Sequence, residues 1–247
     1  MNGSLDKPGQ PAAPSDRRVA IVTGGSQGIG AGLVTALRGK GYAVVATSRS
    51  IAHADEDDLL TVRGDIADAP TARDVVEHAL NRFARIDCLV NDAGVFIAKP
   101  FTDYTWDDYV SITSVNLTGF FHVTQLVIRQ MVTQGSGHVV NVSTSLADRA
   151  DSRTPAALPA LTKGGLEAVT RSLAIEYASR GIRVNAVALG VIRSRDDPGS
   201  YAGMAELHPL GRLGEIGDVV DGVLYLERAT FVTGETLHID GGQAAGR

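Results

Sequence analysis

The sequence of 247 residues has very little cysteine, no long apolar run and no strong excess of charge of either sign. Its single cysteine, Cys88, excludes a disulfide within the chain, and its apolar neighbours in "IDCLV" predict a buried side chain instead of a reactive thiol. No stretch has the apolar character of a signal peptide or a membrane span. A net charge of −5 leaves no broad basic face for nucleic acid. We therefore expect a cytoplasmic protein that binds neither nucleic acid nor membrane.

The chain is rich in glycine and in short apolar runs. Hydrophobic residues make up 44% of it and glycine occurs 28 times, which is typical of a globular α/β protein with many tight turns. Residues 1–16 are rich in Pro, Gly, Ala and Ser and have little to bury, so we expect a disordered extension there. We expect residues 17–247 to form a single domain, because α/β folds of this length often have one core.

Short β-branched runs alternate with longer amphipathic stretches, which predicts a doubly wound parallel sheet covered by helices on both faces. The expected strands are residues 18–25, 42–49, 60–66, 87–94, 137–145, 182–192 and 234–240. The expected helices are residues 28–41, 69–86, 105–135, 161–181 and 215–227. Proline is favoured at the start of a helix, so we expect the fourth of these helices to begin at Pro159. Residues 194–215 form a long loop before the last helix.

A glycine-rich turn, "VTGGSQGIG", follows the first expected strand and opens the first expected helix. Gly24, Gly28 and Gly30 have the spacing G-x-x-x-G-x-G. A helix N-terminus presents free N–H groups and the positive end of its dipole, so a turn in this position can hold a pyrophosphate. A tight strand-to-helix turn without a ligand would also use glycines.

Further motifs follow in order: "NDAG" after the fourth strand, "VNLTG" in a long helix, a Ser/Thr-rich end to the fifth strand, "TKGGLEAVTRSLAIEYASRGIRVNAV", and a C-terminal "FVTGETLHIDGG". With these motifs, nearly the whole chain after Arg17 resembles the short-chain dehydrogenase/reductase family. The resemblance implies a single-domain Rossmann fold, a nicotinamide dinucleotide cofactor and hydride transfer to or from a small molecule. It also implies a homodimer or homotetramer built on two long helices and the last strand.

The resemblance assigns cofactor contacts residue by residue. It implies that the turn holds the phosphates and adenine ribose through Thr23, Gly24, Ser26, Gln27, Gly28, Ile29 and Gly30. The ends of the next strands flank the adenine and the middle of the cofactor through Asp65, Ile66, Asn91, Ala93 and Gly94. The end of the sixth strand meets the nicotinamide through Gly190, Ile192 and Ser194.

The end of the second strand indicates which dinucleotide is bound. An acidic residue there would hydrogen-bond a free 2′-hydroxyl and repel a 2′-phosphate. This sequence has Ser48 followed by Arg49, a hydroxyl and a guanidinium that favour a phosphate. We therefore expect NADP(H) in preference to NAD(H).

Three of the four places of the family's catalytic set are filled. The resemblance implies Asn116 as the helix asparagine, Lys163 as the lysine that holds the ribose, and Thr144 as the hydroxyl that orients the substrate oxygen, with Ser145 as the alternative hydroxyl. The fourth place is a tyrosine four residues before the lysine, and here that residue is Pro159. Position 156, seven residues before the lysine, is alanine.

Other tyrosines leave the source of the proton open. Tyr109 shares a helix face with Asn116 but occupies a place where the family has a packing aromatic, while Tyr104 and Tyr201 lie in loops that could approach a substrate. Two further departures from the family pattern are Asp92, for asparagine in "NDAG", and Leu189, for proline before Gly190.

Three functions remain open at this stage. The first is an NADP(H)-dependent oxidoreductase that acts on a carbonyl or enone with an atypical proton donor. The second is a catalytically silent NADP(H)-binding sensor or assembly partner. The third is a non-redox lyase or isomerase on the same scaffold.

Overall fold

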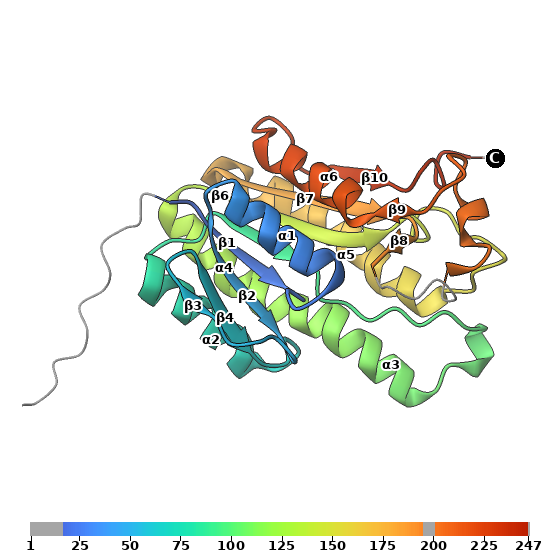
Figure 1. The fold of residues 1–247 in the computed structure, drawn as a ribbon, viewed down its shortest axis with the longest axis horizontal. Helices are drawn as coiled ribbons and strands as arrows, with labels where there is room; N and C mark the ends of the chain where they lie inside the picture. The colour runs from blue at the N-terminus through green and yellow to red at the C-terminus, as the bar shows by residue number, and fades with distance from the viewer. Residues whose placement is uncertain (1–16, 195–200, 247) are drawn as a thin grey trace, which may run out of the picture.

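The computed structural model describes residues 17–194 and 201–246, so the predicted N-terminal extension lies outside the described residues. It contains an eight-stranded sheet in the order β10-β7-β6-β5-β1-β2-β4-β3, in which all pairs are parallel except β3 with β4 (Figure 1). The strands are β1 (Val19–Thr23), β2 (Ala43–Ser48), β3 (Asp55–Glu56), β4 (Leu59–Arg63), β5 (Cys88–Asn91), β6 (Gly137–Thr144), β7 (Ile182–Leu189) and β10 (Thr236–Ile239). A separate pair joins β8 (Ile192–Arg193) to β9 (Gly214–Glu215). The predicted doubly wound α/β fold is confirmed.

Helices cover both faces of this sheet. The helices are α1 (Gly28–Gly39), α2 (Ala69–Phe83), α3 (Trp106–Thr113), α4 (Phe120–Gln134), α5 (Ala157–Tyr177) and α6 (Ile216–Arg228). α1 packs against α6 on one face, and α2 packs against α4 on the other, beside α5. Central strands are therefore apolar on both sides, as in β1, where all five residues are buried.

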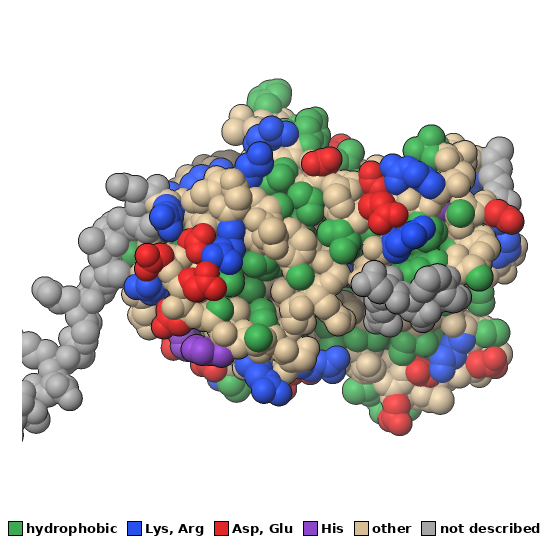
Figure 2. Space-filling model, viewed as in Figure 1, with side chains coloured by type: hydrophobic (Ala, Val, Ile, Leu, Met, Phe, Trp, Pro, Cys, Tyr) green, Lys and Arg blue, Asp and Glu red, His purple; other side chains and the backbone are tan. Residues whose placement is uncertain are grey.

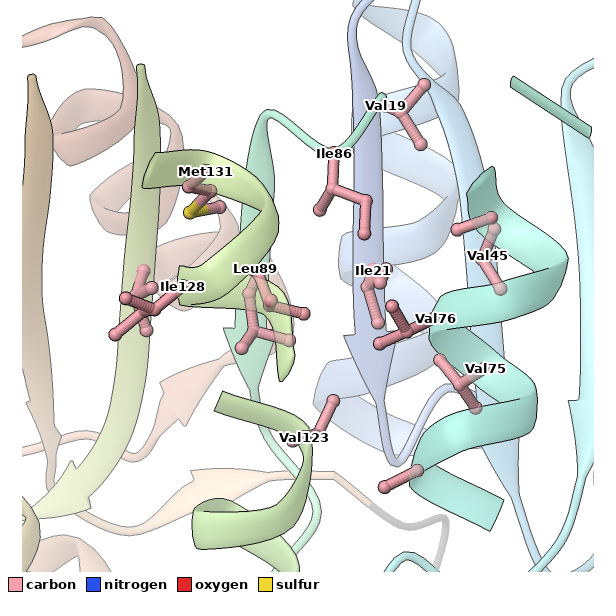
Figure 3. Close-up of a cluster of buried hydrophobic side chains, with 14 of the residues drawn as sticks. Val19, Ile21, Val45, Val75, Val76, Ile86, Leu89, Val123, Ile128 and Met131 are labelled. Carbon is pink, nitrogen blue, oxygen red and sulfur yellow. The ribbon is translucent and has the colours of Figure 1, made fainter. Parts of the chain in front are cut away.

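Two apolar clusters lie on the two sides of the sheet. In Figure 3, Ile21 and Leu89 from adjacent strands point toward Val75 and Val76 of α2 and toward Val123 of α4. The other cluster joins the opposite side chains of the strands to α1 and α6. Cys88 is fully buried in this second cluster, as expected.

The strand order reverses between β1 and β5. The chain runs outward from β1 through β2 to β4, and then returns to the other side of β1 with β5. In a doubly wound sheet, ligands bind outside the carboxyl ends of the strands at such a reversal. Here the residues that follow these two strands are the glycine-rich turn after Thr23 and Asp92–Gly94 after Asn91.

Several predicted boundaries are wrong. The expected helix over residues 105–135 is helical along almost its whole length, but it contains a π-helical turn, Ser114–Gly119, between α3 and α4 that was not predicted. α5 begins at Ala157, two residues before Pro159; the proline stays in the first turn, where backbone N–H groups have no helical partner. The sixth strand ends at Leu189, and the two-residue β3 was not predicted.

Acidic and basic side chains are interspersed on the face shown in Figure 2, without a broad area of one sign. Within the described ranges, no helix is both long enough and apolar enough to cross a membrane.

Candidate active site

The glycine-rich turn borders a cavity of about 430 Å³ at the carboxyl ends of the central strands. Gly24 and Gly28 have φ values of +79° and +55°, which side chains with a Cβ rarely adopt. A Cβ on Gly30 would lie 2.3 Å from the carbonyl oxygen of Gly24, so only glycine lets the helix begin this close to the strand. The turn thus forms a cradle at the N-terminus of α1, which suits an anionic phosphate. Its members that line the cavity are Gly24, Ser26, Gln27, Gly28 and Ile29.

Ser48, Arg49, Asp65 and Ile66, which the sequence analysis places at the adenosine, also line this cavity. Arg49 is mostly exposed, and its Nη1 lies 3.9 Å from Asp65 Oδ2. The structure adds a second arginine that sequence reasoning missed. Arg63 is paired with Ser48 in the register of β2 and β4, and its Nε donates a hydrogen bond of 2.9 Å to the carbonyl oxygen of Arg49. Two arginines therefore lie near the end of β2, where neither Ser48 nor Arg49 is acidic, and the nearby Asp65 carboxylate faces Arg49.

Ala93 and Gly94 also line the cavity, whereas Thr23 and Asn91 do not border it. Thr23 Oγ1 accepts a hydrogen bond from the Ala93 N–H and so fixes the chain after β5. The Asn91 amide donates to Thr124 Oγ1 and Asn141 Oδ1 in the core. These two side chains join elements of the fold and do not face the cofactor cavity.

A second cavity, of about 470 Å³, adjoins the first. Gly94, Ser194 and Ile29 line both cavities, so the two are continuous. Gly190 and Ile192 border the second cavity near this junction. Most of its other walls are apolar, and they come from Val95, Phe96, Ala98, Val142, Leu146, Leu189, Val191, Met204 and Leu207.

Thr144 and Lys163 bring polar groups into this apolar cavity. Thr144 is the last residue of β6 and is partly exposed there, with its hydroxyl 3.4 Å from the carbonyl oxygen of Leu189. Lys163 is buried and its Nζ donates a 2.6 Å hydrogen bond to the carbonyl oxygen of Val142. Burial lowers the pKa of Lys163 to about 8, although the nearby Asp92 carboxylate opposes this.

Asn116 and Ser145 lie behind the cavity wall. The Asn116 amide donates to the carbonyl oxygen of Val95 and to Thr162 Oγ1, and its Oδ1 accepts from the Val95 N–H. It therefore holds the loop after β5 against α5. Ser145 is fully buried, and its hydroxyl donates a 2.9 Å hydrogen bond to Asp240. Of the two predicted hydroxyl groups, that of Thr144 borders the same cavity as Lys163, whereas that of Ser145 is buried outside the cavity.

Pro159 is buried in the first turn of α5 and borders neither cavity. Tyr104 donates its hydroxyl to the carbonyl oxygen of Ile97, and Tyr109 is stacked on Trp106. Tyr201 lines the second cavity, where its hydroxyl accepts a 3.0 Å hydrogen bond from the Ser194 N–H. Among the described residues, Tyr201 is therefore the tyrosine that borders this cavity.

Comparisons with known proteins match this geometry. A family model described as enoyl-(acyl carrier protein) reductase matches residues 24–244. L-xylulose reductase of Bos taurus is 37% identical over 241 residues, which cover 91% of this chain and 96% of the relative. The structure of ElxO with NADP bound has a TM-score of 0.86 at 26% identity and covers 93% of this chain and 100% of its own. A 3-ketoacyl-(acyl-carrier-protein) reductase from Brucella melitensis, complexed with NADH, has a TM-score of 0.85 at 28% identity and covers 92% and 98%.

Proposed function

The chain belongs to the short-chain dehydrogenase/reductase family, an oxidoreductase family, and from this premise we propose that it is an NADP(H)-dependent enzyme that reduces a carbonyl or an enone, or oxidises the corresponding alcohol. One observation carries the proposal: a phosphate cradle and a lysine-bearing apolar cavity adjoin at the carboxyl edge of the sheet. In this proposal residues 17–247 act as one catalytic domain.

The choice of NADP(H) is supported by the residues at the end of β2. Similar structures bind NADP in one case and NADH in another, so the resemblance alone does not decide. Ser48, Arg49 and Arg63 offer a hydroxyl and two guanidinium groups where a carboxylate would repel a 2′-phosphate. The backbone of the glycine cradle would hold the pyrophosphate, and Lys163 the nicotinamide ribose.

The proposed chemistry divides between the two cavities. The substrate carbon would accept a hydride, which the reduced dinucleotide would supply when bound. Lys163 and Thr144 donate hydrogen bonds to the substrate oxygen, where negative charge develops. Lys163 has a pKa of about 8 because of burial, so its ammonium can give up a proton near neutral pH without a tyrosine. Asn116 keeps the wall between Val95 and α5 in place, and Tyr201 is a second proton donor at the rim.

The walls of the second cavity favour a substrate with an apolar body. Apolar side chains surround Thr144 and Lys163, and a small number of polar groups in an apolar pocket fix the orientation of a ligand. A ketone or enone with its oxygen at Thr144 suits this arrangement better than a polyol, whose hydroxyls would lack partners.

We also propose that the protein is a homodimer or homotetramer. A groove of about 600 Å³ between α4 and α5 is lined mainly by Phe120, Phe121, Ile128, Val132, Val169, Leu173 and Tyr177. Phe121 and Ile175, on these two helices, are 55% and 82% exposed. An exposed apolar surface of this extent favours association with a second copy.

Oxidation of NADPH against a panel of ketones, aldehydes, quinones and enones tests the proposed reaction. Pro159→Tyr restores the phenol, and Pro159→Ala is the matched control because it removes the proline without adding an acid. We expect the wild type to turn over at least one member of the panel, and Pro159→Tyr to be no faster than Pro159→Ala.

A wild type that binds NADPH, consumes none and gains turnover only in Pro159→Tyr would contradict the proposed reaction. The protein would then be a silent NADP(H)-binding sensor or assembly partner, because its site would need only the phenol of a tyrosine to become active. Conversion of a substrate without any change in NADPH would instead indicate a lyase or isomerase.

A further inference from the structure

Asp92 lies between the phosphate cradle and the substrate cavity. It follows β5 directly, is half-buried and lines both cavities. A Cβ on Gly30 would lie 2.8 Å from its Oδ2, and a Cβ on Gly24 would lie 3.1 Å from the same oxygen. The carboxyl group is therefore packed against the two glycines that bring the chain close to the phosphate position. The backbone N–H of Gly30 also faces this carboxyl group closely enough to lower its pKa.

Few groups near Asp92 can balance a negative charge. From α5, Lys163 is the one charged side chain that acts on Asp92 among the described residues, and its Nζ already donates to the carbonyl oxygen of Val142. No ion pair within 4 Å joins Asp92 to Lys163. The turn before α1 offers only the neutral side chains of Ser26 and Gln27, and β6 offers the hydroxyl of Thr144.

We propose that Asp92 couples dinucleotide binding to a proton: the protein takes up one proton at this carboxyl group when NADP(H) or NAD(H) binds, so the affinity for the dinucleotide falls as the pH rises. This inference rests on the dinucleotide site of the proposed function and not on turnover. It assigns a role to the carboxylate that stands where the family pattern has asparagine.

The physical reason is repulsion in a shared cavity. A dinucleotide brings the negative charges of its pyrophosphate into the cavity that Asp92 lines, and it displaces the water that reaches this half-buried carboxyl. Both effects disfavour the charged form of Asp92. Burial already raises the pKa of Asp92 to about 7, against the opposing effects of the Lys163 charge and the Gly30 N–H. Asp92 therefore gains or loses its proton near neutral pH.

The direction of the pH dependence follows from the protonation of Asp92 in the free protein and in the complex. Below about pH 7 Asp92 is protonated with and without the dinucleotide, so the affinity is at its highest. Above that pH the free protein carries the charge, and binding must add a proton. The affinity then falls until the pH passes the higher pKa of the complex, about tenfold for each pH unit between the two pKa values.

Fluorescence titration with NADPH from pH 6.5 to 8.5, on the wild type and on Asp92→Asn, tests this. Asparagine keeps the shape of the side chain and cannot ionise. We expect the Kd of the wild type to rise about tenfold more over this range than that of Asp92→Asn, whose remaining rise comes from loss of the Lys163 charge. The two proteins should bind equally at pH 6.5. Repetition with NADH removes any titration of the 2′-phosphate, and the slope left in Asp92→Asn measures the contribution of Lys163.

Calorimetry provides a second readout on the wild type alone. Binding heats at pH 7.5 in two buffers of different ionisation enthalpy should show uptake of about half to three-quarters of a proton by the wild type, because part of Asp92 is already protonated at this pH when its pKa is about 7. Equal slopes in wild type and Asp92→Asn, or no proton uptake by the wild type, would overturn the role of Asp92 while leaving the dinucleotide site intact. No binding of either dinucleotide at any pH would overturn the proposed function itself.

Discussion

Arg63 lies beside the end of β2 through strand pairing. Its position beside Ser48 follows from the register of β2 and β4, and its guanidinium donates a hydrogen bond to the backbone carbonyl oxygen of Arg49. Arginine recognises phosphate through a planar fork of donors, and two arginines can share the charge of one 2′-phosphate.

The change that tests this pair is Arg49→Ala combined with Arg63→Ala. We expect NADPH affinity to fall by about 10- to 100-fold, because each charge-assisted hydrogen bond contributes about 1.5–3 kcal/mol before solvent screening of exposed groups reduces it. NADH affinity should change by less than about threefold. The measurement is the ratio of the two Kd values, and Arg228→Ala, at the far end of α6, serves as the control.

At this scale the sequence predicted the local features and missed the long-range ones. The glycine cradle could be predicted because positive φ values and close contacts demand glycine within one turn. Arg63 could not, because nothing in its own segment indicates which residue of another strand lies beside it. The choice between Thr144 and Ser145 depended on where β6 ends and on Asp240. This residue is distant in the sequence and accepts a hydrogen bond from the Ser145 hydroxyl.

At the scale of elements, α6 is tied to the sheet by a buried polar group. Glu227, near its end, accepts hydrogen bonds from Tyr42 before β2, from Arg18 before β1 and from His138 of β6. Burial opposes the charge, but the hydrogen bonds of His138 and Tyr42 and the charge of Arg18 lower the pKa of Glu227 to about 2. Burial also lowers the pKa of His138, so its ring is neutral and accepts a hydrogen bond from Asn185.

Glu227→Ala should therefore destabilise the protein by about 3–5 kcal/mol, because removal of one partner leaves buried donors unpaired. The free energy of unfolding from urea titration measures this, with exposed Glu235→Ala as a control that should change it by less than about 0.5 kcal/mol. Because the folded-state pKa lies below the ordinary value of 4.5, this stabilisation is complete above about pH 4.5 and is lost as the pH falls toward 2. A wild type whose stability does not decline over that range relative to Glu227→Ala would contradict this explanation.

The sequence predicted the existence of the long elements and was less reliable about their ends. Pro159 marked the start of α5 only to within a turn, since any position of the first turn tolerates a residue without an N–H. The π-helical turn that contains Asn116 was not predicted because it lies between two helical segments and no proline marks the change in hydrogen-bond pattern. The short β8 and β9 pair depends on a contact across more than twenty residues.

At the scale of the whole molecule, the groove between α4 and α5 gives the proposal of an oligomer a direct test. We expect the wild type to sediment as a multiple of 25.9 kDa and Phe121→Arg to sediment as a single chain, because a charge in the middle of the apolar groove would be buried without a partner. Leu210→Arg, another exposed apolar site, should leave the mass unchanged. If Phe121→Arg retains the mass of the wild type, copies associate through another surface.

The order of the strands also divides the sheet into two halves. On one side of β5 lie β1, β2 and β4, whose ends carry the phosphate cradle and the two arginines; on the other lie β6, β7 and β10, whose ends reach Thr144, Leu189 and Asp240. Pro159, between β6 and β7, and Leu189, at the end of β7, both belong to the second half. A lineage with this layout can exchange its reaction, or abandon it, through changes confined to one half of the sheet, while the other half goes on recognising the same nucleotide.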